Sequence, residues 1–273
     1  MIMNNRIPDV YGAESVENWA DDNPMYHASG IWGRGKLLRL LEHRFHTGDR
    51  IVDLGCGTGY VTSCLTRYVG TSGSVIGYDK SKAFIESASL RYGGLPNVRF
   101  RVHDLVGTLP ERDGSVDRFV SSMLLQNLYS QTLAVVFGEV SRCLKDDGEA
   151  TVLTLHPDMF KSPWELDFIT HEESFVQSWR ESPQDDVLIR GFVTNSRGGR
   201  AKEIFMVTHS MEQMTKLLHM YQLTIHEDLP ICIDRQTAER WFGLNETRRH
   251  PINPVFWIFS VRKIANTMPP FTQ

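Results

Sequence analysis

Three glycines separated by single residues follow a short β-rich run near the start of the chain. The segment reads Asp53-Leu-Gly-Cys-Gly-Thr-Gly-Tyr60, and the run before it spans residues 50–54. A strand that ends in this way and continues into a helix turns sharply and exposes its backbone, because glycine has no Cβ. The segment therefore predicts a ligand site at the end of a strand, for a ligand that is flat or anionic.

Short β-rich runs alternate with helical patterns between residues 48 and 157. This alternation is typical of parallel strands joined by crossover helices and predicts an α/β fold. We expect strands at 50–54, 74–78, 97–102, 116–121 and 149–155, and helices at 60–69, at 81–92 and in the amphipathic stretch that ends at Leu144. Gly148 should end that last helix in the left-handed conformation.

The flanking segments also carry patterns of regular structure. We expect helices within 31–45 and at 211–221, and strands at 223–227 and 255–263. The runs 187–194 and 202–208 enclose the turn-forming residues 195–199 and predict a β-hairpin.

Composition narrows the classes of partner. The 273 residues include 29 Lys and Arg against 33 Asp and Glu, with no basic run, so we expect no nucleic acid partner. No apolar stretch approaches the roughly 18 residues of a membrane span, and the first residues lack the apolar core of a signal peptide. We expect no membrane association and a cytoplasmic location. The four cysteines are scattered without C-x-x-C spacing, which predicts reduced thiols and no metal site.

The spacing of the glycines separates the possible ligands. A dinucleotide fingerprint needs G-x-G-x-x-G, but Tyr60 stands where the third glycine would fall, which disfavours NAD. The run from Gly30 to Leu37 approaches a phosphate-binding loop. However, Leu37 cannot offer a hydroxyl to Mg²⁺, and no strand precedes the run.

The run from Asp53 to Gly59 resembles the first motif of the class I methyltransferases that depend on S-adenosylmethionine (SAM), which has the form acid-x-G-x-G-x-G. The resemblance extends to the ends of the next three strands. It implies that SAM is the cofactor and that these strand ends bind it. From the glycine turn, the implied cofactor-binding residues are Asp53, Gly55, Cys56, Gly57 and Gly59.

Each later strand end has a role in the same resemblance. Asp79 ends the second strand, where the family holds the ribose hydroxyls with a carboxylate, and Lys80 follows it. After the third strand, His103, Asp104 and Leu105 correspond to the adenine site. Ser121, at the end of the fourth strand, would lie under the sulfonium.

The resemblance implies a Rossmann-like, seven-stranded, mostly parallel sheet with an antiparallel last strand and a lid insertion. On this basis we expect four parts. They are an N-terminal helical segment that covers the cofactor (1–45), a SAM-binding core (46–157), a lid with the β-hairpin (158–210) and a C-terminal completion of the sheet (211–273).

The sequence says less about the residues that bind the methyl acceptor than about those that bind the cofactor. His156, at the end of the fifth strand, is the first candidate for a base, and His209 is the second; capping of a strand or a helix is the alternative for each. Tyr26 is the candidate for an aromatic contact to the cofactor from the N-terminal segment. Aromatic and acidic residues in the lid favour a small-molecule acceptor, methylated on O or N. The alternatives are a tRNA or protein acceptor, or SAM binding without methyl transfer. A homodimer is compatible with the sequence.

Overall fold

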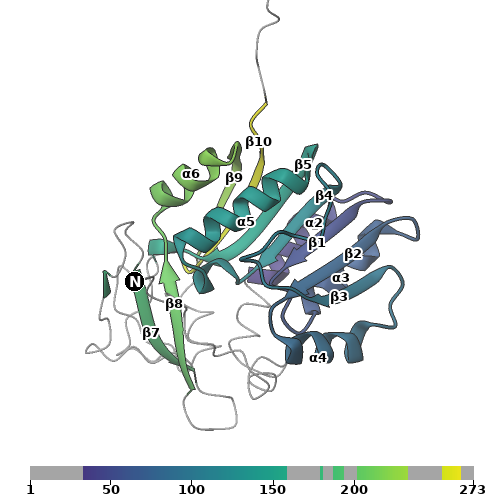
Figure 1. Cartoon of the computed structure of the whole chain (residues 1–273), viewed down its shortest axis with the longest axis horizontal. Helices are drawn as coiled ribbons and strands as arrows, with labels where there is room; N and C mark the ends of the chain where they lie inside the picture. The colour runs from purple at the N-terminus through teal and green to yellow at the C-terminus, as the bar shows by residue number, and fades with distance from the viewer. Residues whose placement is uncertain (1–32, 159–178, 181–186, 194–201, 233–253, 266–273) are drawn as a thin grey trace, which may run out of the picture.

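The computed structural model describes residues 33–158, 179–180, 187–193, 202–232 and 254–265. Seven strands form one sheet in the order β3-β2-β1-β4-β5-β10-β9 (Figure 1). Strand β10 pairs antiparallel with β5 and β9, and the pairs among the first five strands are parallel. The strands are β1 (Arg50–Leu54), β2 (Ser74–Asp79), β3 (Val98–Val102), β4 (Val116–Ser122), β5 (Leu144–Leu155), β9 (Leu223–Ile231) and β10 (Phe256–Lys263). The predicted fold class is confirmed.

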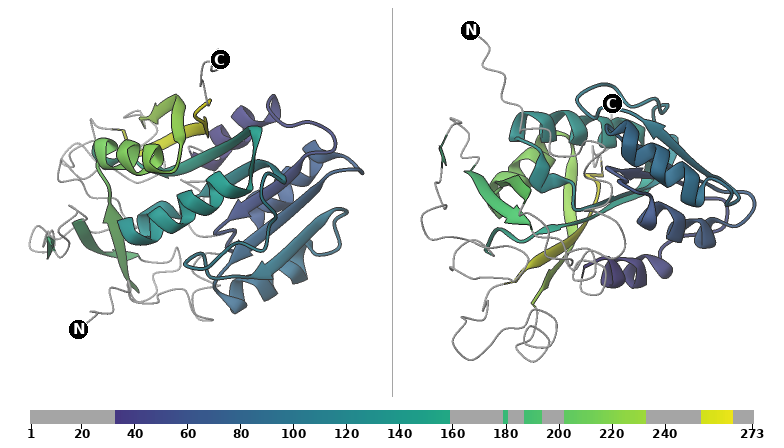
Figure 2. Two further views of the ribbon diagram at one scale, coloured as in Figure 1. Left: turned by 45° about the horizontal axis from the view of Figure 1, so that its top comes forward. Right: turned by 90° about the horizontal axis from the view of Figure 1, so that it is seen from below.

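Helices cover both faces of the sheet (Figure 2). On one face, leucines of α2 and α3 pack on Ile51, Val75 and Val120. On the other face, apolar residues of α5 and α6 pack on Val52 and Ile76. The helices are α2 (Gly35–Glu42), α3 (Tyr60–Val69), α4 (Lys82–Tyr92), α5 (Ser130–Cys143) and α6 (Met211–Met220), with a short 3-10 helix, η3 (Leu125–Asn127). No helix within the described ranges is long and apolar enough to cross a membrane.

The predicted hairpin forms outside the main sheet. Strands β7 (Val187–Val193) and β8 (Lys202–Thr208) pair antiparallel, with Val187 opposite Thr208, and β6 (Trp179–Arg180) extends them to three strands. The place of residues 158–210 as a lid stays a prediction.

One expectation about backbone conformation is wrong. Gly148 is not among the glycines with positive φ, and it lies inside β5, which begins at Leu144 directly after α5. The reason for glycine here is space. A Cβ on Gly148 would lie 2.7 Å from Leu144 Cδ1 and 3.0 Å from the carbonyl oxygen of Asp117. The glycine therefore permits close packing of β5 on β4 and does not cap the helix.

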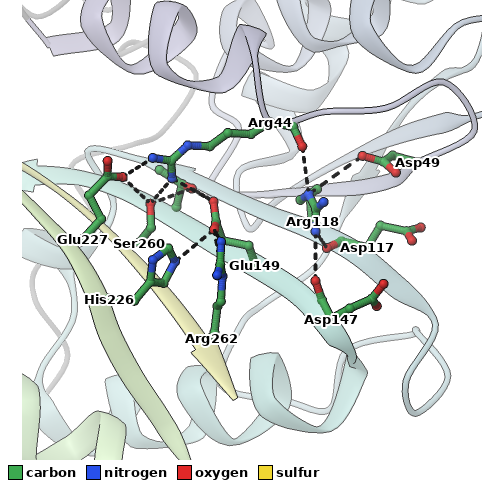
Figure 3. A network of polar contacts seen from close by, with 11 residues as sticks. Arg44, Asp49, Asp117, Arg118, Asp147, Glu149, His226, Glu227, Ser260 and Arg262 are labelled. Carbon is green, nitrogen blue, oxygen red and sulfur yellow. Dashed lines mark hydrogen bonds and ion pairs between the residues drawn. The ribbon is translucent and has the colours of Figure 1, made fainter. Parts of the chain in front are cut away.

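An ion-pair cluster joins the elements at the amino edge of the parallel strands (Figure 3). Glu149 is 4% exposed, and its two carboxylate oxygens lie 2.9 Å from Arg44 and 2.9 Å from Arg262. His226 lies 2.9 Å from the same carboxylate, and Arg44 also pairs with Glu227. Because Arg44 follows α2 and its partners belong to β5, β9 and β10, the cluster ties this helix to the C-terminal half of the sheet.

Candidate cofactor and acceptor site

The three glycines of the turn after β1 all have positive φ, at +70° for Gly55, +54° for Gly57 and +86° for Gly59. A Cβ on Gly55 would lie 2.8 Å from Leu124, and a Cβ on Gly59 would lie 2.8 Å from Ala88. A Cβ on Gly57 would meet nothing within 4 Å. The outer two glycines are thus required for packing as well as for backbone conformation. The middle one leaves open space in front of the turn.

Strand β2 holds this turn in place through its last two residues. The carbonyl of Tyr78 accepts hydrogen bonds from the N–H of Gly55 (2.8 Å) and of Cys56 (3.0 Å). The carboxylate of Asp79 accepts from the N–H of Gly57 (2.9 Å) and from that of Ser81 (2.9 Å). Asp79 therefore stands beside the open glycine, at the edge where parallel α/β sheets bind ligands.

Asp53 is a buried carboxyl at the end of β1, with 1% of its surface exposed. One of its oxygens accepts a hydrogen bond from the Thr62 hydroxyl at 2.6 Å, and the other, Oδ1, has no hydrogen bond with the described residues. Burial is the main cause that raises the pKa of Asp53 to about 7. The negative charge of Asp79 adds to this rise, whereas the hydrogen bond from Thr62 and the positive charge of Arg34 oppose it. A cation bound near Oδ1 would stabilise the ionised carboxylate.

The residues predicted at the end of β3 form the adjoining edge. Asp104 is exposed, and its carboxylate accepts from the N–H of Val106 at 3.2 Å. Leu105 is buried, and the imidazole of His103 lies edge-on to the ring of Tyr78, with 5.5 Å between centroids. The Nε2 atom of His103 is buried and has no hydrogen bond within the described ranges.

The other predicted cofactor residues differ in their exposure. Ser121 is buried, and its hydroxyl donates to the carbonyl of Leu54 at 3.1 Å, which links the ends of β4 and β1. Cys56 is buried, and burial raises the pKa of its thiol well above the ordinary value. Lys80 is exposed. Tyr26 lies outside the described residues.

Several residues that the sequence reasoning missed shape the same edge. Met123, just after β4, has φ +61°. Gln126 and Asn127 donate their side-chain amides to its carbonyl, at 2.7 and 3.0 Å. Nothing in the sequence marks a methionine for the left-handed region. Arg34 and Thr62 both affect Asp53 at the end of β1. The sequence does not mark them, because only the fold shows which side chains return to the end of this strand.

The two histidines proposed as bases occupy different places. His156 is 7% exposed; its Nδ1 accepts from the N–H of Asp158 at 3.1 Å, and its ring lies 6.1 Å from that of Trp257. His209 is 6% exposed, and its Nε2 donates to the carbonyl of Leu128 at 2.8 Å. Of the two, His209 lines the pocket described next.

That pocket, called here the β5 pocket, lies between β5, η3, β8 and α6. Its walls include Gln126, Thr154, Val207, His209, Met214 and Trp257. Among the described residues that line it there is no Asp, Glu, Lys or Arg. Its walls are mostly apolar, its polar groups are an amide, hydroxyls and an imidazole, and its accessible volume is about 20 Å³, room for a group of about the size of a water molecule.

Comparison with known proteins decides what kind of site this edge holds. Residues 51–148 match the family described as "Methyltransferase domain". Residues 51–148, the core of the chain, are a methyltransferase domain. The match spans the glycine turn and the ends of β2, β3 and β4, so it covers most of the predicted donor residues of this methyltransferase domain. The family predicted from the turn, and with it SAM as the cofactor, is confirmed.

The methyltransferase domain is similar to several curated proteins. It is 31% identical over 112 residues to the 2-phytyl-1,4-naphtoquinone methyltransferase of Synechococcus elongatus, a match that covers 40% of this chain and 47% of that protein. It is 34% identical over 141 residues to the demethylmenaquinone methyltransferase of Lactobacillus johnsonii, covering 50% and 56%. Similarity to the juvenile hormone acid O-methyltransferase of Bombyx mori is 27% over 182 residues, covering 60% and 64%. The chain thus spans about half the length of the curated relatives it matches.

Solved structures extend the likeness to nearly the whole chain. The CcbJ methyltransferase of Streptomyces caelestis superposes with a TM-score of 0.60 at 15% identity, covering 93% of this chain and 96% of that one. A SAM-dependent methyltransferase of Clostridium acetobutylicum superposes with a TM-score of 0.55 at 16% identity, covering 85% and 90%. At these identities the likeness establishes the fold.

Proposed function

We propose that this chain transfers the methyl group of SAM to an O or N atom of a small, uncharged organic molecule, in a biosynthetic pathway. The observation that carries the proposal is the open glycine turn at Gly57 with Asp79 beside it, inside a methyltransferase domain. The bound cofactor would supply an electrophilic methyl group on a sulfonium.

The donor side is built from residues with the right chemistry. Asp79 offers carboxylate oxygens, which suit the two hydroxyls of a ribose. Gly57 lets the ligand approach the backbone, because no side chain fills the space in front of it. Asp53 brings a buried oxygen without a hydrogen bond among the described residues, which suits a cationic group of the cofactor. His103, Asp104 and Leu105 are proposed to border the adenine.

The acceptor side is proposed to be the β5 pocket. Its lining by apolar side chains and by amide, hydroxyl and imidazole groups favours a small apolar part of an acceptor over a carboxylate or an ammonium group. Two of the relatives above are named for quinone substrates, which are small, uncharged organic molecules. This likeness supports the class of acceptor and leaves its identity open.

Methyl transfer needs alignment of acceptor, methyl and sulfur and, for an O–H or N–H acceptor, removal of a proton. His209 is the better placed base, since it lines the β5 pocket. Because a carbonyl can only accept, Nε2 of His209 carries a proton that it donates to the carbonyl of Leu128 at 2.8 Å, and this bond fixes the orientation of the ring. The bond from Asp158 to Nδ1 of His156 favours the capping alternative for that residue.

The proposal is tested by incubating the chain with SAM and a panel of uncharged phenols, hydroquinones and aromatic amines. Mass spectrometry should find a product heavier than its acceptor by one CH₂, formed together with S-adenosylhomocysteine (SAH). Asp79→Ala should abolish the product at low SAM concentration. SAM bound with no methylated product from the panel, together with methylation of tRNA or protein, would replace the small-molecule proposal by the macromolecular alternative.

The two histidines are separated in the same assay. His209→Ala should lower turnover by about tenfold or more with SAH affinity unchanged, because it removes a proton acceptor and no donor contact. His156→Ala is the matched comparison, since both imidazoles are more than nine-tenths buried. A loss confined to His156→Ala would reverse the assignment.

A further inference from the structure

The backbone directly after β4 is held in an unfavourable shape by side chains. Met123 has φ +61°, a region that residues with a Cβ rarely occupy. Its N–H donates to the carbonyl of Leu153 at 2.7 Å, and its carbonyl accepts the amides of Gln126 and Asn127. Such a conformation persists only where the surroundings fix it, and it is concentrated at functional sites.

Gln126 makes a bond at each end of its amide. Its Nε2 donates to Met123 at 2.7 Å, and its Oε1 accepts from the hydroxyl of Thr154 at 3.0 Å. Gln126 is 8% exposed and Thr154 4%. Because a carbonyl can only accept, the amide cannot be reversed without losing the bond to Met123. The side chain is therefore fixed in one orientation.

The two ends of this connection face different parts of the site. On one side, Leu124 packs so closely on Gly55 that a Cβ there would lie 2.8 Å away, which joins the segment to the glycine turn. On the other side, Gln126 and Thr154 both line the β5 pocket. Gln126 thus connects the proposed acceptor pocket to the backbone next to the glycine turn.

We propose that Gln126 is a positioning residue that holds the backbone of Met123 in the shape the methyl donor requires and ties it to Thr154 in the β5 pocket. This inference rests on the proposed function. A group that enters the pocket would contact the amide that sets the donor side, so acceptor and donor would be aligned through one side chain.

The chain supplies a matched control in the same region. Gln213, on α6, donates its amide to the hydroxyl of Ser130 at 2.7 Å, at the start of α5. Gln126 thus bonds Met123 directly after β4, whereas the amide of Gln213 bonds the first residue of α5. Methionine is similar in size to glutamine but has no amide, so replacing either glutamine by methionine removes its hydrogen bonds and keeps its bulk.

The test measures SAH binding by isothermal titration calorimetry with the full chain. Gln126→Met should weaken SAH binding by about tenfold, the effect of one lost hydrogen bond to a buried partner. Gln213→Met should stay within about twofold of the wild type at a comparable fall in melting temperature. Equal SAH affinity in wild type and Gln126→Met, or an equal loss in Gln213→Met, would overturn the inference. No SAH binding by the wild type would instead defeat the proposed function.

A second pair of variants keeps the inference testable if Gln126→Met does not fold. Thr154→Val removes the bond that orients the amide and should weaken SAH binding by about threefold. In the background of Met123→Gly, which accepts positive φ without strain, the penalty of Gln126→Met should shrink to about twofold. Wild-type affinity in Thr154→Val, or a penalty that stays about tenfold in the Met123→Gly background, would show that Gln126 only fills space.

Discussion

The backbone N–H of Gly57 donates to the carboxylate of Asp79 at 2.9 Å, across 22 residues of sequence. This bond joins the two motifs that the sequence offered separately, the glycine turn after β1 and the acid that ends β2. It places the open face of the turn beside the carboxylate proposed for the ribose. The bond therefore fixes the turn and the carboxylate of Asp79 relative to each other.

The first prediction concerns Gly57→Ala. A Cβ here meets no neighbour in the described chain but would occupy the space proposed for the cofactor, so SAH affinity should fall by tenfold or more. Gly114→Ala is the control, because Gly114 also has a positive φ, +57°, with nothing within 4 Å. Both variants should lose about 1–2 kcal/mol of stability from the left-handed backbone. Calorimetry and thermal unfolding measure the two effects, and equal SAH affinities in the two variants would contradict the site.

The second prediction uses the pKa of Asp53, which burial raises to about 7. Between the ordinary carboxyl range and pH 7, the folded chain keeps a proton on Asp53 that the unfolded chain releases. Raising the pH across this window therefore lowers the free energy of unfolding. In Asp53→Asn this loss should be absent, so the variant should gain stability relative to wild type at pH 8 and not at pH 4. Denaturant unfolding across this range would show it, and a constant difference would refute it.

A second variant tests how the hydrogen bond from Thr62 affects the pKa of Asp53. Thr62→Val removes the hydroxyl that bonds Asp53, a bond that lowers the pKa. The loss of stability should then extend to higher pH than in wild type. A shift toward lower pH would mean that Thr62 does not stabilise the ionised form.

The third prediction concerns the ion-pair cluster at the opposite edge of the sheet. Burial acts to raise the pKa of Glu149, but hydrogen bonds from Arg262 and Arg44 outweigh it and lower the pKa. The contribution of Glu149 is therefore present above its ordinary pKa and is lost as the pH falls through the lowered value. Glu149→Gln should cost about 2 kcal/mol at neutral pH, because it replaces a buried carboxylate that accepts hydrogen bonds from the partly exposed Arg44 and Arg262.

The control for Glu149 is an exposed pair of the same kind. Lys82 and Glu86 lie 3.5 Å apart with side chains 80% and 66% exposed, so Glu86→Gln should have almost no effect on stability. Glu149→Gln should not change SAH affinity, since Glu149 lies at the edge of the sheet opposite the glycine turn. Urea unfolding would contradict the account if the two variants lost the same amount.

The fourth prediction tests the role of Gly148 as a packing residue. Gly148→Ala should lose about 1–3 kcal/mol, because the new methyl would press on Leu144 and on the carbonyl of Asp117. Gly94→Ala, where a Cβ meets nothing within 4 Å, should stay within about 0.5 kcal/mol of wild type. A neutral Gly148→Ala would show that the strand adjusts without cost.

Most of the fold was predictable because its signals are local. Alternating apolar runs gave β1 and α3 at their observed bounds, and the acids at strand ends gave Asp79 and Asp104 as neighbours along one edge. The hairpin of β7 and β8 followed from two β-rich runs around a turn. Each of these signals lies within a few residues of the feature it predicts.

The features missed depend on contacts between distant segments. The local sequence around Gly148 predicts a helix cap, whereas packing against Asp117 decides its role. The backbone of Met123 is also held by the carbonyl of Leu153, and the place of His209 in the β5 pocket is set by β8 lying against η3. A single sequence carries no pattern for such contacts.

The most direct test of the account is the titration of the ligand-free chain with SAH and, separately, with NAD⁺. We predict one SAH site with a Kd well below about 1 mM, weakened by about tenfold or more in Asp79→Ala, and no heat from NAD⁺. Absence of SAH binding at that concentration, or equal binding by wild type and Asp79→Ala, would contradict the donor site built on the glycine turn.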